Sequence, residues 1–192
     1  MAQLSFGRKR KRKRVNYDLV REVLTWLVQI IAVCLIAFAV VWYFGFKVSI
    51  IGDSMKPELT NGDITLLNRL VYDVRAPKRG DVIAFKPNGN ESSHYYVKRV
   101  IGLPGETVEY REGNILIDGE ILEEDYTTTD IIELGLLEEP IVLKSGEFFV
   151  LGDDRQNSDD SRIANIGNVE REEIAGRVWF VISPKENFGF VK

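Results

Sequence analysis

The chain has 192 residues, of which 45% are hydrophobic, so it can bury one or two small cores and is not disordered throughout. Its formal net charge is -4, but the sequence up to Lys47 holds nine basic and two acidic residues, whereas 16 basic and 27 acidic residues follow. Basic residues confined to one end do not fit a nucleic-acid-binding domain, so we expect no nucleic acid partner.

An uncharged, mostly apolar stretch covers residues 24–46, with Trp26, Trp42 and Tyr43 near its ends. As a helix it spans about 34 Å, enough for a hydrocarbon core of about 30 Å. Seven consecutive Lys/Arg at residues 8–14 predict a cytoplasmic N-terminus and a translocated C-terminal part. We therefore predict a basic cytoplasmic segment (1–23), a transmembrane helix (24–46) in contact with membrane lipid, and an extracytoplasmic domain (47–192) of a single-pass cell-membrane protein.

Two other interpretations of this stretch are open. A cleavable signal peptide usually has a shorter apolar core that ends in a small-x-small site, whereas this stretch ends in bulky aromatic residues. A buried helix of a soluble protein would not explain the aromatic ends and the step in charge. The only cysteine, Cys34, lies within the stretch, so we expect no disulfide in the following domain.

After Lys47 the pattern changes to short β-type runs separated by turn signals such as Asn61-Gly62 and Pro104-Gly105. The expected strands are 48–51, 64–67, 81–85, 95–101, 107–110, 114–117, 146–151 and 176–182. The fold class is therefore mainly β, an antiparallel sheet domain after one N-terminal helix. The acidic residues 123–140 are weakly patterned and fit a surface loop or a short helix.

One histidine, His94, lies in a polar stretch and reads as an exposed loop residue. A Ser-His-Asp mechanism would have to use it, and a zinc site would lack His or Cys partners. Lys98 differs, because alternation along a strand places it on one face with Tyr96 and Val100. Burial there could lower its pKa from about 10.4 and make it a general base, although a strand lysine more often reaches solvent or pairs with a carboxylate.

Two further segments carry polar groups. In the segment 52–59, Gly52 permits close approach of another backbone and Pro57 ends a strand, so Ser54 would lie at an exposed corner with its hydroxyl and N–H accessible, although an ordinary turn fits too. The segment 152–162 contains four aspartates and reads as a loop tied by Asp–Arg pairs. Its spacing lacks the EF-hand pattern, so we expect no metal and no cofactor.

Together these three segments resemble bacterial type I signal peptidases in content, order and position after an N-terminal anchor. The matching boxes are Gly52 to Leu59, Arg79 to Phe85 followed by Tyr96 to Glu106, and Gly152 to Arg162. The resemblance implies a serine endopeptidase with Ser54 as nucleophile and Lys98 as general base. It also implies that Ser158 orients the lysine, that Asp160 pairs with Arg162, and that Asp153 and Arg155 support the same loop.

The resemblance implies the remaining site residues as well. The Ser54 N–H would form part of the oxyanion hole, and where some relatives have a hydroxyl residue this chain has Gly52, so the second donor would be backbone or water. The substrates would be signal peptides of secretory preproteins, cut after small-x-small sequences. The residues expected to narrow the substrate pockets are Ile50, Met55, Leu59 and Tyr96.

Competing readings remain. Self-cleaving repressors share a Ser-Lys dyad but need a DNA-binding region, and the endoplasmic-reticulum signal peptidase has histidine in place of Lys98. A mitochondrial inner-membrane peptidase would also use serine and lysine. The alternative from another class is a non-catalytic membrane-anchored homologue that acts in binding or pilus assembly.

Overall fold

The computed structural model describes residues 17–90 and 92–192, which divide into two compact units, one ending at Ala39 and one beginning at Val40. The first unit consists of helix α1 (Tyr17–Phe44), whose last residues belong to the second unit. Residues 17–42 of this helix are long and apolar enough to cross a membrane. The basic residues 8–14 lie outside the described residues.

Helix α1 begins seven residues before the expected apolar stretch and ends two residues before the expected end. Residues 17–23 continue the helix because Leu19, Arg21 and Glu22 all have high helix propensity. At the other end, strand β1 begins at Phe46 and terminates the helix, so the apolar stretch of the sequence overlaps the first β-strand by one residue.

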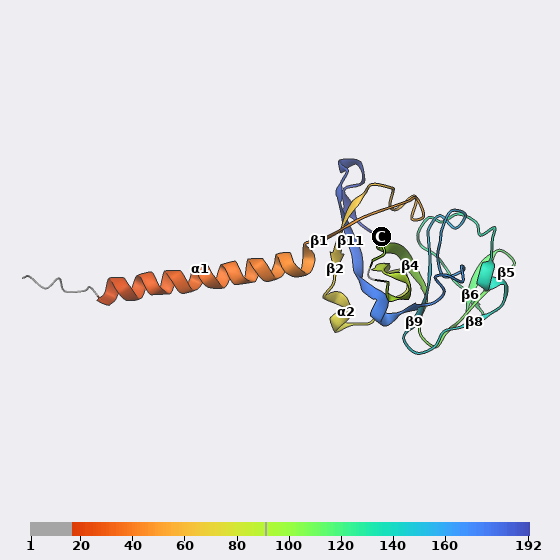
Figure 1. Cartoon of the computed structure of the whole chain (residues 1–192), viewed down its shortest axis with the longest axis horizontal. Coiled ribbons are helices and arrows are strands. Elements are labelled where there is room, and N and C mark those ends of the chain that lie inside the picture. The colour runs from red at the N-terminus through yellow and green to blue at the C-terminus, as the bar shows by residue number, and fades with distance from the viewer. Residues whose placement is uncertain (1–16, 91) are drawn as a thin grey trace, which may run out of the picture. The chain divides into compact units, whose positions relative to one another are not determined.

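The second unit contains two antiparallel sheets (Figure 1). The larger sheet has the order β1-β2-β11-β3-β4-β9-β10, with β12 paired to β11, and the smaller has the order β7-β6-β5-β8. The strands are β1 (Phe46–Ser49), β2 (Ile64–Asn68), β3 (Val82–Phe85), β4 (Tyr96–Gly102), β5 (Thr107–Arg111), β6 (Asn114–Ile117), β7 (Glu120–Ile121), β8 (Ile141–Val142), β9 (Glu147–Leu151), β10 (Val169–Glu170), β11 (Ile174–Ser183) and β12 (Gly189–Phe190).

Short helical segments connect these strands. They are the α-helix α2 (Val71–Val74) and the 3-10 helices η1 (Pro87–Gly89), η2 (Gly135–Glu138), η3 (Arg171–Glu173) and η4 (Lys185–Asn187). Only η2 lies in the acidic segment 123–140, whose other residues have no regular structure apart from bends at Tyr126 and Glu139. The expectation of a surface loop or short helix there is confirmed in this mixed form.

All eight expected strands are present, and the mainly antiparallel β fold is confirmed. The strands that the pattern does not predict are β7, β8, β10 and β12, which have two residues each. A period of two cannot be recognised in two residues, so these strands depend on pairing with a neighbour that is already in place.

Strand β3 is buried on both faces, and this determines the surroundings of the neighbouring strand β4. Val82 and Ala84 pack into one apolar cluster, while Ile83 and Phe85 pack into another. Strand β4 pairs with β3 so that Lys98 lies opposite Ile83 and Arg99 opposite Val82. Both cationic residues are therefore placed in the interior of the domain.

A third apolar cluster joins the small sheet to the large one. Phe149 of β9 and Ile101 of β4 pack with Val108 and Ile115 of the small sheet, and all four are buried. Gly102 at the end of β4 is needed here, because a Cβ at this position would lie 2.6 Å from side-chain atoms of both Val108 and Leu143.

Replacing Phe149, which is 0% exposed, with alanine should lower the free energy of unfolding by about 3–5 kcal/mol, because the ring leaves a cavity between the two sheets. Phe190→Ala is the matched control, since Phe190 is 74% exposed and its loss should cost about 1 kcal/mol or less. Denaturant unfolding of the whole chain in detergent measures both values. Equal values for the two variants would contradict this account of the core.

Candidate functional site

Ser54 lies in a series of turns between β1 and β2 that hydrogen bonds hold closed. The Gly52 backbone adopts a φ of +87°, which permits the sharp change of direction before the serine. Asn61 stabilises this segment through two hydrogen bonds. Its side-chain oxygen accepts the Gly52 N–H at 3.0 Å, and its backbone N–H donates to the Asp53 carboxylate at 3.3 Å. The serine is thus presented at a corner, as the sequence predicts.

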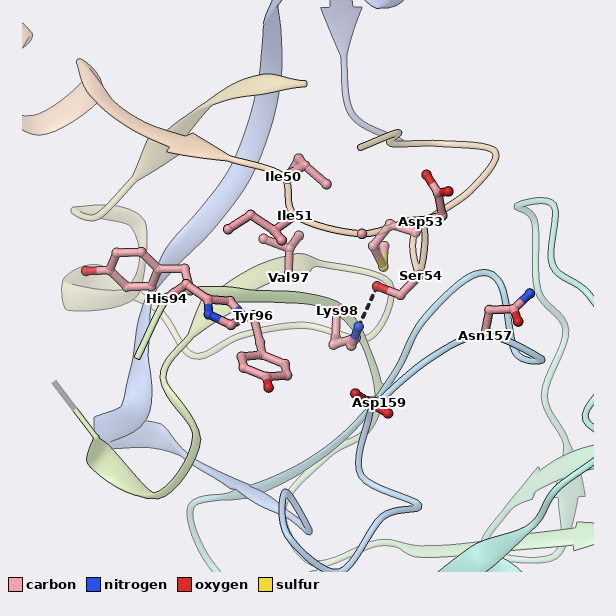
Figure 2. A pocket seen from close by; sticks show the side chains of 13 residues that line it. Ile50, Ile51, Asp53, Ser54, His94, Tyr96, Val97, Lys98, Asn157 and Asp159 are labelled. Carbon is pink, nitrogen blue, oxygen red and sulfur yellow. Dashed lines mark hydrogen bonds between the residues drawn. The ribbon is translucent and has the colours of Figure 1, made fainter. Parts of the chain in front are cut away.

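Lys98 projects from β4 directly at this corner (Figure 2). Its Nζ is hydrogen-bonded to Ser54 Oγ at 2.5 Å, and the residue is only 3% exposed. Burial lowers the pKa of Lys98 to about 8, while the charges of Asp160 and Asp159 act in the opposite direction. A substantial fraction of the amine is therefore neutral near pH 8, and the neutral amine can accept the proton of the serine hydroxyl.

Arg99, the next residue of β4, is 1% exposed and points to the opposite face. Its Nε and Nη2 donate to the two carboxylate oxygens of Asp153 at 2.8 and 2.6 Å. Burial alone would lower the pKa of Arg99, but the hydrogen bonds and charge of Asp153 outweigh this effect and raise it. Asp153 therefore forms its ion pair with Arg99, whereas Arg155, which the resemblance assigns to the support of the same loop, pairs with Glu124.

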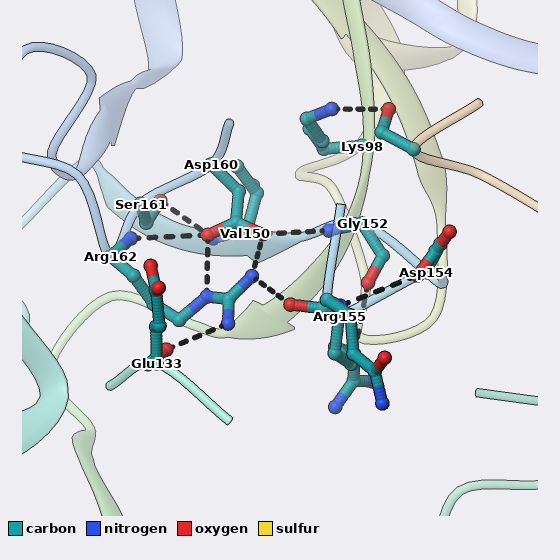
Figure 3. Close-up of polar contacts among 11 residues, drawn as sticks. Lys98, Glu133, Val150, Gly152, Asp154, Arg155, Asp160, Ser161 and Arg162 are labelled. Atoms are coloured by element: carbon teal, nitrogen blue, oxygen red, sulfur yellow. Dashed lines mark hydrogen bonds and ion pairs between the residues drawn. The ribbon is translucent and has the colours of Figure 1, made fainter. Parts of the chain in front are cut away.

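The polar segment 152–162 is organised by a second buried pair (Figure 3). Arg162 Nε donates to Asp160 Oδ1 at 2.8 Å and Nη2 donates to Oδ2 at 2.9 Å, so the expected Asp160–Arg162 pair is present. Asp160 also accepts the Gly152 N–H at 3.1 Å, and Arg162 donates to the Arg155 carbonyl at 2.7 Å. These bonds fold the segment back on itself beside β9.

The turn that contains Ser54 and this polar segment are in backbone contact. The Asp154 N–H donates to the Ser54 carbonyl at 3.0 Å. A Cβ at Gly152 would lie 2.4 Å from the same Ser54 carbonyl and 2.2 Å from Ser158 Oγ. Gly152 therefore lets Ser54, Ser158 and the start of the polar segment converge.

The acidic segment 123–140 holds the polar segment 152–162 in place through contacts that the sequence did not predict. Glu124 forms an ion pair with Arg155, and the Glu133 carbonyl accepts a hydrogen bond from Arg162 at 2.9 Å. The Tyr126 ring stacks under the Arg99 guanidinium, 4.0 Å from the ring centroid. The partners lie 27 to 31 residues apart in the sequence, and Glu124 is one of many acidic residues there, so no local pattern could identify these contacts.

Of the two backbone N–H groups at the predicted oxyanion positions, one is free to donate to a substrate and the other is not. Among the described residues, the Ser54 backbone N–H has no recorded acceptor and is available to a substrate carbonyl. The second donor was expected to be backbone or water at the position of Gly52, and the Gly52 N–H is already donated to Asn61 in this geometry. A second donor would have to come from water or from rearrangement of the Asn61 contact.

An open cleft runs past the Ser54–Lys98 contact, and three of the four predicted substrate residues line it. These are Ile50, Met55 and Tyr96, whereas Leu59 is 0% exposed and packs in the core beneath the cleft. The prediction that Leu59 lines the substrate pockets is therefore wrong. The sequence reasoning did not identify the cleft positions of Ile51, Asp53, His94, Tyr95, Val97, Asn157 and Asp159. His94 is exposed, as expected, and its ring stacks on the Tyr96 ring with the two ring centroids 5.0 Å apart.

Ser158 is not among the residues that line the cleft, and its hydroxyl oxygen is buried. In the part of the chain that the structure describes, Ser158 Oγ has no hydrogen-bond partner. The expected contact with the Lys98 amine is therefore not formed in this state, and the orienting role stays a prediction. Within the same described residues, no group of three or more His, Cys, Asp or Glu side chains could hold a metal ion.

Comparison with known proteins gives a consistent result. Residues 23–183 match the family described as signal peptidase, peptidase S26. The chain is 32% identical over 191 residues to signal peptidase I P of Bacillus subtilis subsp. natto, which covers 96% of this chain and 98% of that one. It is 30% identical over 183 residues to signal peptidase IB of Staphylococcus aureus (strain COL), covering 88% and 93%. A crystal structure of a signal peptidase I from Enterococcus faecalis is 37% identical, with a TM-score of 0.44, and covers 55% of this chain and 98% of that one.

Replacing Asp153 with asparagine should lower the free energy of unfolding by about 3–5 kcal/mol, because the buried Arg99 guanidinium loses its counterion. Glu109→Gln is the control, since Glu109 pairs with the exposed Arg111 and its loss should change stability by about 1 kcal/mol or less. Denaturant unfolding in detergent measures the difference. A loss for Asp153→Asn no larger than the control's would show that Arg99 does not depend on this carboxylate.

Proposed function

Because this chain belongs to the signal peptidase family, peptidase S26, we propose that it cleaves signal peptides from secretory preproteins with Ser54 and Lys98 as a catalytic dyad. The observation that carries the proposal is the 2.5 Å contact between Ser54 Oγ and Lys98 Nζ in an open cleft. The buried lysine has a lowered pKa and no carboxylate within ion-pair distance among the residues described.

In the proposed reaction, neutral Lys98 takes the proton of the Ser54 hydroxyl as Oγ attacks the carbonyl carbon of the scissile bond. The Ser54 N–H donates to the oxyanion of the tetrahedral intermediate. The Lys98 ammonium then protonates the leaving amine as the C–N bond breaks, which releases the mature protein and leaves an ester on Ser54. Lys98 next removes a proton from water, and the resulting attack releases the signal peptide and restores the serine.

The supporting residues hold Lys98 and Ser54 in position relative to each other. Asp160 and Arg162 fix the polar segment beside β9, and Asp153 holds Arg99 on the other face of β4. Arg155 donates to the Gly152 carbonyl at 2.9 Å and supports the same turn. Rotation of the Ser158 hydroxyl toward Lys98 during the reaction would give its buried oxygen a partner and would orient the ammonium.

The proposed substrates have small residues at the first and third positions before the scissile bond. Ile50, Met55 and Tyr96 line the cleft and would exclude large side chains from these positions. Ile50 and Met55 are buried among core residues, so neither can move aside without disturbing the packing. Leu59 contributes only indirectly, through the core beneath Met55.

We further propose that helix α1 anchors the protein in a membrane. Its apolar residues supply the length that a bilayer requires, and the basic residues before it favour a cytoplasmic N-terminus. Residues 1–23 would then be cytoplasmic, residues 24–46 would contain the spanning segment, and residues 47–192 would act on the extracytoplasmic side. Preproteins emerging from the membrane would be cleaved on this side.

The whole chain in detergent should cut a preprotein with an Ala-x-Ala site after the second alanine, whereas Ser54→Ala and Lys98→Ala should each lose at least about 1000-fold in kcat/KM. Ser145→Ala and Lys78→Ala are matched controls at exposed positions outside the cleft and should remain active. Gel analysis and N-terminal sequencing of the product measure the result. If a folded chain cut none of several preproteins, a non-catalytic binding role would replace the proposal.

The pH profile tests the role assigned to Lys98. The neutral fraction of an amine with a pKa of about 8 increases as pH rises, so kcat/KM should increase about tenfold from pH 7 to pH 9 and level off above that. Initial rates with a peptide substrate that does not titrate in this range measure the profile. A rate that stays constant from pH 6 to pH 9 would exclude Lys98 as the base.

A further inference from the structure

The cleft has two chemically different ends, with the Ser54–Lys98 contact between them (Figure 2). One end is apolar and aromatic, with Ile51, Tyr96 and His94 among its lining residues. The other end is polar and contains Asn157 and Asp159 from the segment 152–162. A substrate that lies along the cleft therefore meets different chemistry before and after the nucleophile.

The two carboxylates that line the cleft differ in how their charge is compensated. Asp53 is paired with Lys56 at 3.1 Å and accepts the Asn61 N–H at 3.3 Å. Within residues 17–90 and 92–192, Asp159 has neither a hydrogen bond nor an ion pair at contact distance, and its side chain is exposed in the cleft. At the polar end Asp159 therefore contributes a negative charge that no ion pair among these residues neutralises, although this charge acts on Lys98 through space.

The neighbouring residue shows that Asp159 is not needed to hold its own segment together. Asp160 is fully buried and is occupied by Arg162 and by the Gly152 N–H. Successive side chains thus point in different directions, one into the loop's hydrogen-bond network and one into the cleft. A carboxylate that takes no part in the fold and faces the reaction site is available to a bound substrate.

The proposed function fixes which part of the substrate reaches Asp159. If the small residues before the scissile bond lie against Ile50, Met55 and Tyr96, the residues after the bond pass Lys98 toward Asn157 and Asp159. We infer that Asp159 is a specificity-determining residue that favours lysine or arginine, and disfavours glutamate or aspartate, at the first two positions after the scissile bond. This inference rests on the proposed function.

The other charges of the cleft do not cancel this preference. Among the described residues that line the cleft, Lys98 and His94 are the basic ones. Lys98 is neutral in the reactive form of the proposed dyad, and His94 lies at the opposite end. Because Asp159 is exposed to solvent, its effect on a charged substrate should be several-fold, not larger, and should weaken as salt is added.

The test uses three preproteins that differ only in the first two residues after an Ala-x-Ala site, which are Lys-Lys, Gln-Gln or Glu-Glu. For the unaltered chain in detergent at low salt, kcat/KM should fall in that order, by about three- to tenfold between the first and the last. Asp159→Asn should bring the three values together, and Asp159→Lys should reverse their order. Asp73→Asn, at an exposed position outside the cleft, is the matched control and should keep the original order.

The possible outcomes separate this inference from the function on which it rests. Equal cleavage of all three preproteins by the unaltered chain would overturn the inference and leave the peptidase function in place. The same factor of change for all three substrates in Asp159→Asn would also overturn it, since Asp159 would then act on Lys98 and not on the substrate. Failure to cut any of the three would overturn the proposed function and the inference together.

Discussion

The structure depends on the burial of two consecutive cationic side chains, Lys98 and Arg99, on opposite faces of one strand. Burying a charge without a partner costs far more than a small domain can offset, so each side chain must be either neutralised or paired. Arg99 cannot lose its proton in the pH range in which proteins are stable. It forms a bidentate ion pair with the Asp153 carboxylate. Lys98 has no such partner among the residues described, and burial shifts it toward the neutral amine instead. One strand thus holds one permanently charged side chain and one side chain whose pKa is lowered to about 8.

The surroundings of these two residues come from segments far apart in the chain. The Ser54 turn precedes β2, the polar segment 152–162 follows β9, and the acidic segment contributes Tyr126 and Glu124. The first two converge at Gly152, since its lack of a side chain lets the polar segment lie against the Ser54 backbone. The acidic segment is therefore part of the support of the site, although it has little regular structure of its own.

The strands, and the separation of Lys98 from Arg99 on the two faces of β4, could be predicted from the alternation and turn residues of the sequence. The pairing of Ser54 with Lys98 was implied only by the resemblance to signal peptidases. The burial of Leu59 and the donation of the Gly52 N–H to Asn61 could not, since both depend on how the turn 52–61 packs against the core. Arg99 looked like an ordinary strand residue, and its partner Asp153 lies 54 residues away. The cleft position of Asp159 was missed for a similar reason, because its neighbour Asp160 has the same chemistry and the opposite orientation.

The pairing of β4 with β3 carries a further consequence for changes in chain length. Lys98 and Arg99 occupy adjacent positions opposite Ile83 and Val82, and side chains on a strand alternate between faces. An insertion or deletion of one residue within β4 that shifted this pairing would turn the arginine toward Ser54 and the lysine toward Asp153. The arginine could not accept a proton there, and the lysine would be held in its charged form. Homologous chains should therefore vary in the length of the loops around β4 while the strand itself keeps its number of residues.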